Sequence, residues 1–471
     1  MKQPIFYMLF LFFIVRVSSQ VFEVQALKTA GDIDKRINLV ILSEGYQETE
    51  FDKFETDATN FMNAMFSQSP FAEYADYFNV YIIKVPSNES GADHPGTATD
   101  VTEPQSPVTD VDTYFNSTFD AFGYHRYLYY GIDYADAASA ELKIRSVLAD
   151  NFPTYDQTLI LVNSSHYGGT GGEFPIASIH MSSSEIAIHE LGHSLFNLKD
   201  EYLVPDVYYA EAINMTQETD PSLVKWTNWV GVNEVGVYPY GSSGTAATWN
   251  RPHQNCKMRY LGYSFCSVCQ EGMIERIHNL LSPIDSYMPV SNTVDNPSLP
   301  IDFQLNLIAP IPNTLERVWT LNAVNFANNV DSISLEEIDL LEGENTLTAV
   351  VHDATGFLKI DNHETSHIYT VSWTINYSSL GIGNIKSRMN NYVISMYPNP
   401  TNNTINLKFE SDDVAIVNVE IVGLDGRKVK SMKLSNFKNQ QIDISAFSQG
   451  IYLTNFYSNK TLLATKKLVK N

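Results

Sequence analysis

The sequence predicts a multidomain chain in which an α/β (α+β) domain is followed by two all-β modules. Strand-like and helical hydrophobic patterns alternate from about residue 36 to residue 277, which favours an α/β domain. After Pro283 and Pro289 the pattern changes to short alternating strands, which is typical of a β-sandwich. A stretch rich in Gly, Ser and Asn then precedes a last all-β unit.

Composition excludes several classes of function. The 471 residues include 54 acidic and 30 basic side chains, which gives a formal net charge of −24. Nucleic acids and anionic membranes are bound by clustered Lys and Arg, so we expect no nucleic-acid partner. A hydrophobic fraction of 44% indicates a folded chain, and three cysteines are too few for a disulfide-rich scaffold.

The N-terminus predicts export. Lys2 precedes an apolar run over residues 6–15, and Ser18 and Ser19 offer a cleavage site. This run is shorter than the span of about 20 residues that crosses a membrane, so we interpret residues 1–19 as a signal peptide. No later segment of the sequence reaches transmembrane length.

The remaining boundaries follow from the changes in pattern. We expect the α/β domain at 20–285, an Ig-like or fibronectin-like β-sandwich at 286–380, a linker at 381–391 and the C-terminal unit at 392–471. Within the α/β domain we expect strands at 37–42, 78–85 and 158–162, and helices at 51–66, 137–151 and 184–198.

The helix expected at 184–198 carries most of the chemistry. Ser182, with Glu185 three residues later, has the pattern of a capping box. Ile188 and Leu191 recur at helical spacing on the side that would face a core.

A complete His-Glu-x-x-His motif lies inside this helix. Four residues advance a helix by about 400°, so His189 and His193 lie one turn apart on the same face, where two neutral imidazoles can share one Zn²⁺. Glu190 would lie beside the metal, where it can take a proton from a zinc-bound water and return it to the leaving amine. The motif therefore predicts a zinc-dependent hydrolase.

A catalytic zinc needs a third protein ligand and an open fourth position. We prefer Asp200, seven residues after His193, and Glu201 is the competing candidate. The chain must leave the helix and turn back for Asp200 to reach the metal. Asn197 tolerates the left-handed conformation that such a turn needs.

These motifs resemble the IgA-peptidase family of zinc metallopeptidases, within the wider metzincin-like group. The resemblance implies a zincin-type fold with a twisted sheet, an active-site helix and a methionine-containing turn under the metal. Carried over by position, it makes His189, His193 and Asp200 ligands, Glu190 the general base and Met258 the turn methionine. Besides the motif itself, the matching stretches are Ile37–Tyr46, Ser69–Phe71, Phe78–Val80, Ser87–Gly91, Tyr167–Gly169, Lys225–Trp226, Cys256–Arg259 and Phe265–Cys269. In this chain Asn197 stands where members of the family often have Gly.

Neighbouring residues invite further hypotheses. Tyr260 follows the turn methionine at a spacing that in some metzincins places a phenol near the metal as an oxyanion stabiliser, and a packed tyrosine is the alternative. The glycine-rich stretch at 167–172 is either a rim to which an extended substrate adds as a strand or a flexible loop. His166 and His180 have no ligand spacing, so we treat them as non-ligands.

Cys256, Cys266 and Cys269 allow two interpretations. A second zinc site normally needs four ligands, and no fourth cysteine completes the set unless His253 does so. A disulfide from Cys256 to Cys266 or Cys269 fits an exported protein better, and it leaves one thiol unexplained.

The C-terminal unit resembles the sorting domain of type IX secretion substrates. Its matching segments, in order, are Met396–Pro400, Asp425–Gly426, Ile442–Ser445, Gln449–Tyr452 and Thr465–Lys470. The resemblance implies the type IX secretion machinery as a partner and a protein that is secreted or held at the cell surface of a Gram-negative bacterium.

Two functions remain open from the sequence. The first is a secreted zinc endopeptidase that cleaves extracellular proteins or peptides. The second is an exported adhesin or binding protein whose peptidase-like domain keeps zinc without turnover. Glu190 favours the peptidase, because it is not a ligand and a binding protein has no need of it. Neither the cleavage specificity nor action on immunoglobulin A follows from these residues.

Overall fold

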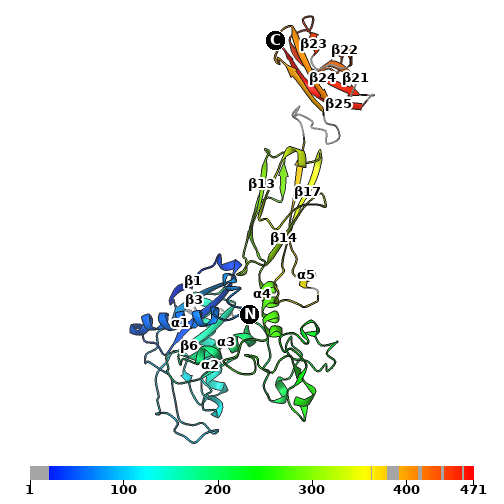
Figure 1. Cartoon of the computed structure of the whole chain (residues 1–471). Helices are drawn as coiled ribbons and strands as arrows, with labels where there is room; N and C mark the ends of the chain where they lie inside the picture. Colours follow the sequence, from blue (N-terminus) through cyan, green and yellow to red (C-terminus); the bar gives the residue numbers. More distant parts are fainter. Residues whose placement is uncertain (1–20, 362, 379–391, 412–415, 436–439, 459–460) are drawn as a thin grey trace, which may run out of the picture.

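The computed structural model describes residues 21–361, 363–378, 392–411, 416–435, 440–458 and 461–471. Along the chain these residues form an N-terminal α/β unit, a unit of two facing sheets and a C-terminal all-β unit, which succeed one another in space (Figure 1). The expected signal peptide at 1–19 and linker at 381–391 lie outside the described residues.

The N-terminal unit is built on a mixed sheet of six strands in the order β1-β3-β2-β6-β8-β7. The four central strands are parallel to one another, and both edge strands are antiparallel to their neighbours. The strands are β1 (Glu23–Lys28), β2 (Ile37–Glu44), β3 (Phe78–Lys84), β6 (Gln157–Val162), β7 (Gly169–Thr170) and β8 (Ile176–Ser178).

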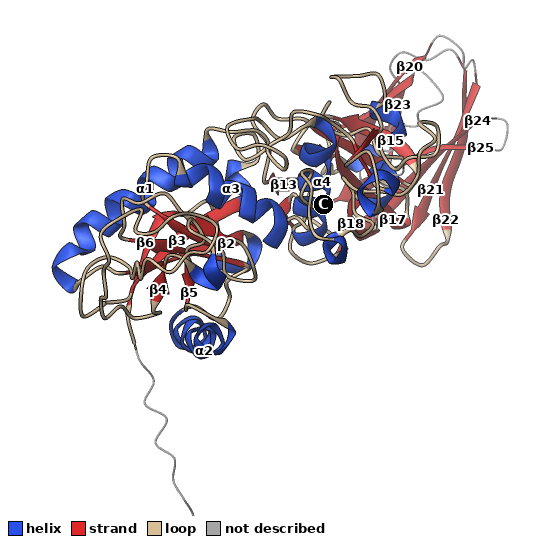
Figure 2. Ribbon diagram, turned by 90° about the horizontal axis from the view of Figure 1, so that it is seen from below, coloured by secondary structure: helices blue, strands red, loops and turns tan. Residues whose placement is uncertain are grey.

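Helices cover both faces of this sheet (Figure 2). Alternate residues of β2 face opposite ways, since side chains alternate along a strand. Leu39 and Ile41 pack in the core beneath three helices, whereas Val40 faces the core beneath one helix. The first core contains residues of α1 (Phe51–Phe66), α3 (Ser183–Ser194) and α4 (Ser267–Leu280), and the second contains residues of α2 (Tyr134–Asn151).

The longer connections carry short strand pairs. Residues 85–133 join β3 to α2 and contain one such pair, and residues 195–266 join α3 to α4 and contain the other. The pairs are β4 (Ser117–Thr118) with β5 (Tyr129–Tyr130), and β9 (Tyr238–Pro239) with β10 (Asn250–Arg251).

The second unit consists of two facing sheets. Trp319 and Trp373 stack with ring centroids 5.9 Å apart, and Phe303 of the other sheet contacts Trp373 at 5.1 Å. One sheet has the order β11-β13-β16 and the other β12-β18-β17-β14-β15. The strands are β11 (Ile284–Met288), β12 (Thr293–Asp295), β13 (Ile301–Leu307), β14 (Leu315–Leu321), β15 (Val324–Asn328), β16 (Ser332–Leu335), β17 (Gly343–Asp353) and β18 (Tyr369–Tyr377).

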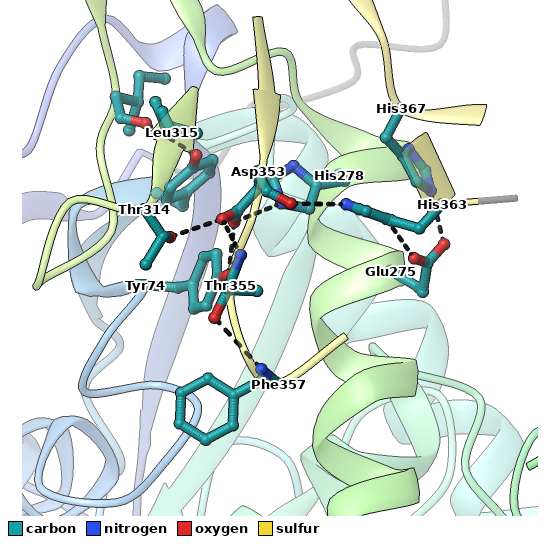
Figure 3. A network of polar contacts seen from close by, with 12 residues as sticks. Tyr74, Glu275, His278, Thr314, Leu315, Asp353, Thr355, Phe357, His363 and His367 are labelled. Atoms are coloured by element: carbon teal, nitrogen blue, oxygen red, sulfur yellow. Dashed lines mark hydrogen bonds and ion pairs between the residues drawn. The ribbon is translucent and has the colours of Figure 1, made fainter. Parts of the chain in front are cut away.

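The second unit reaches back to the first. Asp353 at the end of β17 accepts a hydrogen bond from the Tyr74 hydroxyl (2.6 Å) and lies 3.0 Å from His278 Nε2 on α4 (Figure 3). Phe357 and Leu358 pack against the first core of the α/β unit. The connection from β17 to β18, which contains α5 (His363–Ser366), therefore belongs to the interface between the units.

The C-terminal unit has two sheets, in the orders β19-β20-β23 and β22-β21-β24-β25, around a small core of its own. Its strands are β19 (Tyr392–Tyr397), β20 (Thr404–Ser411), β21 (Ile416–Gly423), β22 (Lys428–Ser435), β23 (Gln440–Asp443), β24 (Gly450–Ser458) and β25 (Thr461–Lys470).

Candidate metal centre and active site

The helix that carries the motif is shorter than expected. α3 ends at Ser194 rather than at 198, because the backbone turns back within the next few residues. Asn197 has a φ of 58°, so the expected left-handed conformation is confirmed there. The Leu198 N–H donates to the Gly192 carbonyl (2.9 Å), which closes the turn.

The expected capping box at the start of α3 is wrong. Ser182 makes no side-chain cap hydrogen bond. Glu185 instead accepts hydrogen bonds from Lys257 Nζ and from the Gly262 N–H (2.9 Å). Burial alone would raise the pKa of Glu185, but the Lys257 ammonium holds it below its usual range. The Glu185 carboxylate thus neutralises the buried charge of Lys257. Leaving that charge unpaired would destabilise the fold.

Three candidate ligand atoms converge beside α3. Asp200 Oδ1 lies 3.1 Å from His189 Nε2 and 3.1 Å from His193 Nε2, and the two nitrogens lie 3.2 Å apart. Ligands at about 2.0–2.1 Å from a tetrahedral zinc lie about 3.3–3.4 Å from one another. The spacing therefore fits one small divalent cation.

Backbone carbonyls orient both imidazoles. His189 Nδ1 lies 3.0 Å from the Lys257 carbonyl oxygen, and His193 Nδ1 lies 2.7 Å from the Leu198 carbonyl oxygen. A carbonyl can only accept, so each Nδ1 carries the proton and each Nε2 presents its lone pair to the common centre. This is the tautomer that a metal-binding histidine needs.

The structure places Asp200, and not Glu201, beside the imidazoles. The Tyr240 hydroxyl donates to the Asp200 carbonyl (2.7 Å), which fixes that residue in the turn. Burial alone would raise the pKa of Asp200, but the adjacent imidazoles of His189 and His193 hold it well below its usual range. Glu201 is fully buried on the other side of the chain, where its carboxylate contacts Cys269 Sγ at 3.1 Å.

Glu190 lies next to the candidate metal centre. One of its carboxylate oxygens lies within 4.8 Å of the imidazole nitrogens of His189 and His193. Burial raises the pKa of Glu190, although the two imidazoles act in the opposite direction. A methyl group on Gly171, next to β7, would overlap Glu190 Oε2, so this glycine leaves room for the carboxylate.

Met258 lies in a tight turn beneath α3. The Cys256 carbonyl accepts hydrogen bonds from the Arg259 and Tyr260 N–H groups, each at 2.9 Å, which closes the turn. The Met258 side chain is fully buried, and its sulfur lies against Gly192 of α3. The Glu201 N–H donates to the Met258 carbonyl (2.7 Å), so the turn also supports the chain next to Asp200.

Tyr202, which directly follows the two acidic candidates in the family signature, also lies at this site. Tyr202 stacks on His189, with ring centroids 6.4 Å apart, and lines the same cleft as Glu190. Burial, together with the charges of Asp200 and Glu190, raises the pKa of Tyr202. Tyr260 is about as exposed as Tyr202 and stacks with Arg259 instead.

A cleft adjoins the candidate centre on each side. One has a volume of about 860 Å³ and is lined by His189, Glu190 and Gly169 of β7. The other has a volume of about 670 Å³ and is lined by His193 and Asp200. Because the ligands divide between the two clefts, an extended chain could cross the metal centre from one to the other.

Comparison with known families agrees with this geometry. Residues 25–240, which include the whole motif and Asp200, match the sequence profile described as IgA Peptidase M64. The N-terminal unit is similar to an IgA Peptidase M64 domain. M64 is a family of metallopeptidases, and the matched residues of this chain contain groups of side chains that could hold a metal ion. Met258 and the three cysteines lie beyond the matched residues.

The C-terminal unit also matches a family profile. Residues 395–471 match the profile described as the secretion system C-terminal sorting domain. This tail indicates secretion by the type IX system to the cell surface or the medium, and it implies interaction with that machinery. Among the residues that the structure describes, no helix combines the length and hydropathy needed to cross a membrane.

Other comparisons add little. No curated protein matches the chain. The fibronectin(III)-like modules of CbhA from Clostridium thermocellum share 12% identity over 40% of this chain and 93% of theirs, with a TM-score of 0.14. A β-glucuronidase from Parabacteroides merdae shares 9% identity over 48% of this chain and 28% of its own, with a TM-score of 0.15. Likenesses at these scores carry no argument about this protein.

Proposed function

We propose that this protein is a secreted zinc endopeptidase in which His189, His193 and Asp200 hold the metal and Glu190 is the general base. The observation that carries the proposal is the convergence of three ligand atoms at 3.1–3.2 Å with a separate carboxylate beside them. A metal-binding protein without turnover would need the first feature and not the second.

The residues divide the work of peptide hydrolysis among them. Bound zinc would lower the pKa of a coordinated water and polarise the scissile carbonyl. Glu190 takes the proton of the attacking water and passes it to the leaving amine. Tyr202 lies on the same side of the centre, where its hydroxyl can donate to the oxyanion.

The M64 domain also offers a place for an extended substrate. β7 is the last strand of the sheet and lies next to α3, and Gly169 lines the larger cleft. A substrate strand can pair with β7 through backbone hydrogen bonds, which select an extended conformation rather than a particular sequence. The order of the domains then supports release of the enzyme from a Gram-negative cell through the sorting tail.

The test uses the purified full chain with denatured casein and a diverse peptide library. We expect cleavage that stops with a zinc chelator and returns when zinc is restored. Glu190→Ala should lose cleavage while its zinc content equals that of the wild type, whereas His189→Ala should lose cleavage and one equivalent of zinc. Equal cleavage by Glu190→Ala would refute the assigned base. Failure of every substrate, with zinc retained, would favour the exported binding protein.

A further inference from the structure

A second group of metal-ligand side chains lies in the connection from β3 to α2. His94 Nε2 lies 3.4 Å from Asp120 Oδ1, and His125 Nδ1 lies 3.5 Å from the same oxygen. Ligand atoms of these three residues all lie within 4.8 Å of one another. Glu103 Oε1 lies 3.4 Å from His125 Nδ1, at the edge of the group. Two imidazoles and two carboxylates are therefore gathered in one part of the α/β unit.

The atoms that face one another there have no hydrogen bonds. Within the described part of the chain, His94 Nε2, Glu103 Oε1, Asp120 Oδ1 and His125 Nδ1 are all buried without a hydrogen-bond partner. His94 is 2% exposed and Asp120 is fully buried. Leaving several buried polar atoms unpaired is costly, and hydrogen-bonded ion pairs normally bring N and O to about 2.7–2.9 Å. The separation and the missing hydrogen bonds both differ from those of ordinary ion pairs.

The surrounding backbone holds these side chains in place. Asp120 has a φ of 58°, and its Oδ2 accepts the Thr97 N–H (3.0 Å), which leaves Oδ1 directed at the imidazoles. The backbone of His94 exchanges two hydrogen bonds with Thr109, at 3.0 and 3.1 Å. The His125 N–H donates to an aspartate of the same connection, Asp100 (2.9 Å). The cluster is thus a built site and not a chance meeting of mobile side chains.

We propose that His94, Asp120 and His125 bind a second Zn²⁺, and that Glu103, whose Oε1 lies 3.4 Å from His125 Nδ1 but outside the group of three, moves towards the ion as the fourth ligand. Neighbouring ligands of a tetrahedral zinc lie about 3.3–3.4 Å apart, and the three measured separations are 3.4–3.5 Å. Two neutral imidazoles and two carboxylates suit zinc, whereas calcium takes six to eight oxygens. The two carboxylates also neutralise the charge of the ion in this buried place.

This site would shape the wall of the active-site cleft. His125 lines the larger cleft together with its neighbours Tyr124, Arg126 and Tyr127, and the same cleft is lined by Glu190. A metal bound by His125 holds this wall without touching the reacting atoms. The consequence, which rests on the proposed peptidase function, is that loss of this metal raises KM more than it lowers kcat.

The test measures zinc in the purified full chain by mass spectrometry. We expect His94→Ala and His125→Ala each to lose one equivalent of zinc relative to the wild type. The matched control is His166→Ala, because the His166 ring lies 5.8 Å from that of His94 but supplies none of the converging atoms. This control should keep its zinc. A folded double variant of His94 and His125 with the zinc content of the wild type would overturn the proposal.

A measurement on the wild type covers the case in which the variants do not fold. An anomalous difference map at the zinc edge should show a peak among the four side chains, separate from the one at His189. A map with a peak at His189 and none among the four would also overturn the site. Both experiments detect zinc directly and do not measure cleavage. They therefore test the site even if the protein cleaves no substrate.

A different cluster, behind the active site, supports a third metal position. Glu201, Cys256, Cys266 and Cys269 are all buried, and their ligand atoms lie within 4.8 Å of one another. The three cysteines are free thiols in the structure, and Cys256 Sγ lies 3.7 Å from Cys269 Sγ. Glu201 Oε2 has no hydrogen-bond partner among the described residues. Glu201 is thus a fourth ligand for the cysteines that their spacing in the sequence does not reveal.

We infer that these four residues bind a structural Zn²⁺. Two thiolates at about 2.3 Å from a tetrahedral zinc lie about 3.8 Å apart, close to the spacing observed. A disulfide would use two sulfurs and leave the third thiol beside a buried carboxylate whose Oε2 has no hydrogen-bond partner among the described residues. Zinc accounts for all four groups, and it ties the chain after Asp200 to the start of α4.

Thiol reactivity and cobalt absorption test this site in the full chain. We expect all three thiols to resist alkylation until zinc is chelated, and Co²⁺ to give thiolate charge-transfer absorption that Cys266→Ser weakens and His94→Ala leaves unchanged. A Cys256–Cys266 or Cys256–Cys269 disulfide in the native protein, found by peptide mapping without reductant, would overturn the site. So would rapid alkylation of all three thiols in the zinc-loaded protein.

Discussion

Gly192 lies directly against Met258: a methyl group on Gly192 would come within 2.8 Å of the methionine sulfur. The helix that carries the two histidines and the turn below it therefore touch at a residue without a side chain. Because of this close contact, α3 lies near enough to the turn for the Lys257 carbonyl to reach His189.

Gly192→Ala should destabilise the protein. In an exposed helix this change would stabilise by roughly 0.5–1 kcal/mol, but here overpacking against Met258 should cost about 1–3 kcal/mol. Thermal unfolding of the zinc-loaded chain measures the change. Met258→Ala removes the obstacle, so Gly192→Ala should cost less in that background. Equal costs in both backgrounds would show that the contact does not matter.

Gly171→Ala should impair turnover without loss of metal. The added methyl group would displace the Glu190 carboxylate, and misplacing a catalytic group by about 1 Å can cost roughly a hundredfold in rate. The measurement is kcat/KM on a peptide substrate together with zinc content. Wild-type turnover in this variant would mean that Glu190 does not need the position it has in the structure.

Tyr240→Phe should weaken zinc binding at the active site. The change removes the hydrogen bond to the Asp200 carbonyl, worth about 0.5–1.5 kcal/mol, and loosens a ligand. Tyr209→Phe is the matched control, because the two rings pack edge to face at 5.3 Å and the Tyr209 hydroxyl has no partner among the described residues. Competition with a chelator measures zinc affinity. Equal effects of the two changes would count against a positioning role for Tyr240.

The contact between the first two units should depend on pH. Glu275 Oε1 and Oε2 lie 2.6 Å from His363 Nδ1 and His367 Nε2 (Figure 3). Burial alone would raise the pKa of Glu275, but its hydrogen bond with His363 lowers this pKa overall. Burial alone would lower the pKa of His363, but the same hydrogen bond raises it overall. The pKa of His367 is lowered, chiefly by burial.

The signs give a window for this contact. A lowered Glu275 pKa means that its contribution to stability is lost as the pH falls below about 4.5, and a raised His363 pKa means a loss as the pH rises above about 6.5. The lowered pKa of His367 acts in the opposite direction, because protonation of this buried imidazole as the pH falls destabilises the contact. We expect Glu275→Gln to speed hydrogen exchange in residues 353–368 most between these values. A difference independent of pH would contradict the assignment.

Local patterns were enough for much of the active site. Period-four spacing placed His189 and His193 on one face of a helix, because one turn is 3.6 residues whatever the rest of the chain does. The left-handed turn at Asn197 was also predictable, since it depends on the conformational preference of one residue. The strand at 37–42 and the helix at 51–66 follow from hydrophobic period in the same way.

The sequence by itself determined the motif, the acidic candidates, the export signal pattern and the order of the units. Only the tertiary structure decided which of Asp200 and Glu201 faces the imidazoles, drew Glu185 away from a helix cap to Lys257, and put Glu201 among the cysteines. These choices depend on groups far apart in the chain that meet in a buried place. A buried charge pairs with the group that tertiary packing places next to it, and the identity of that group cannot be predicted from the local spacing of residues.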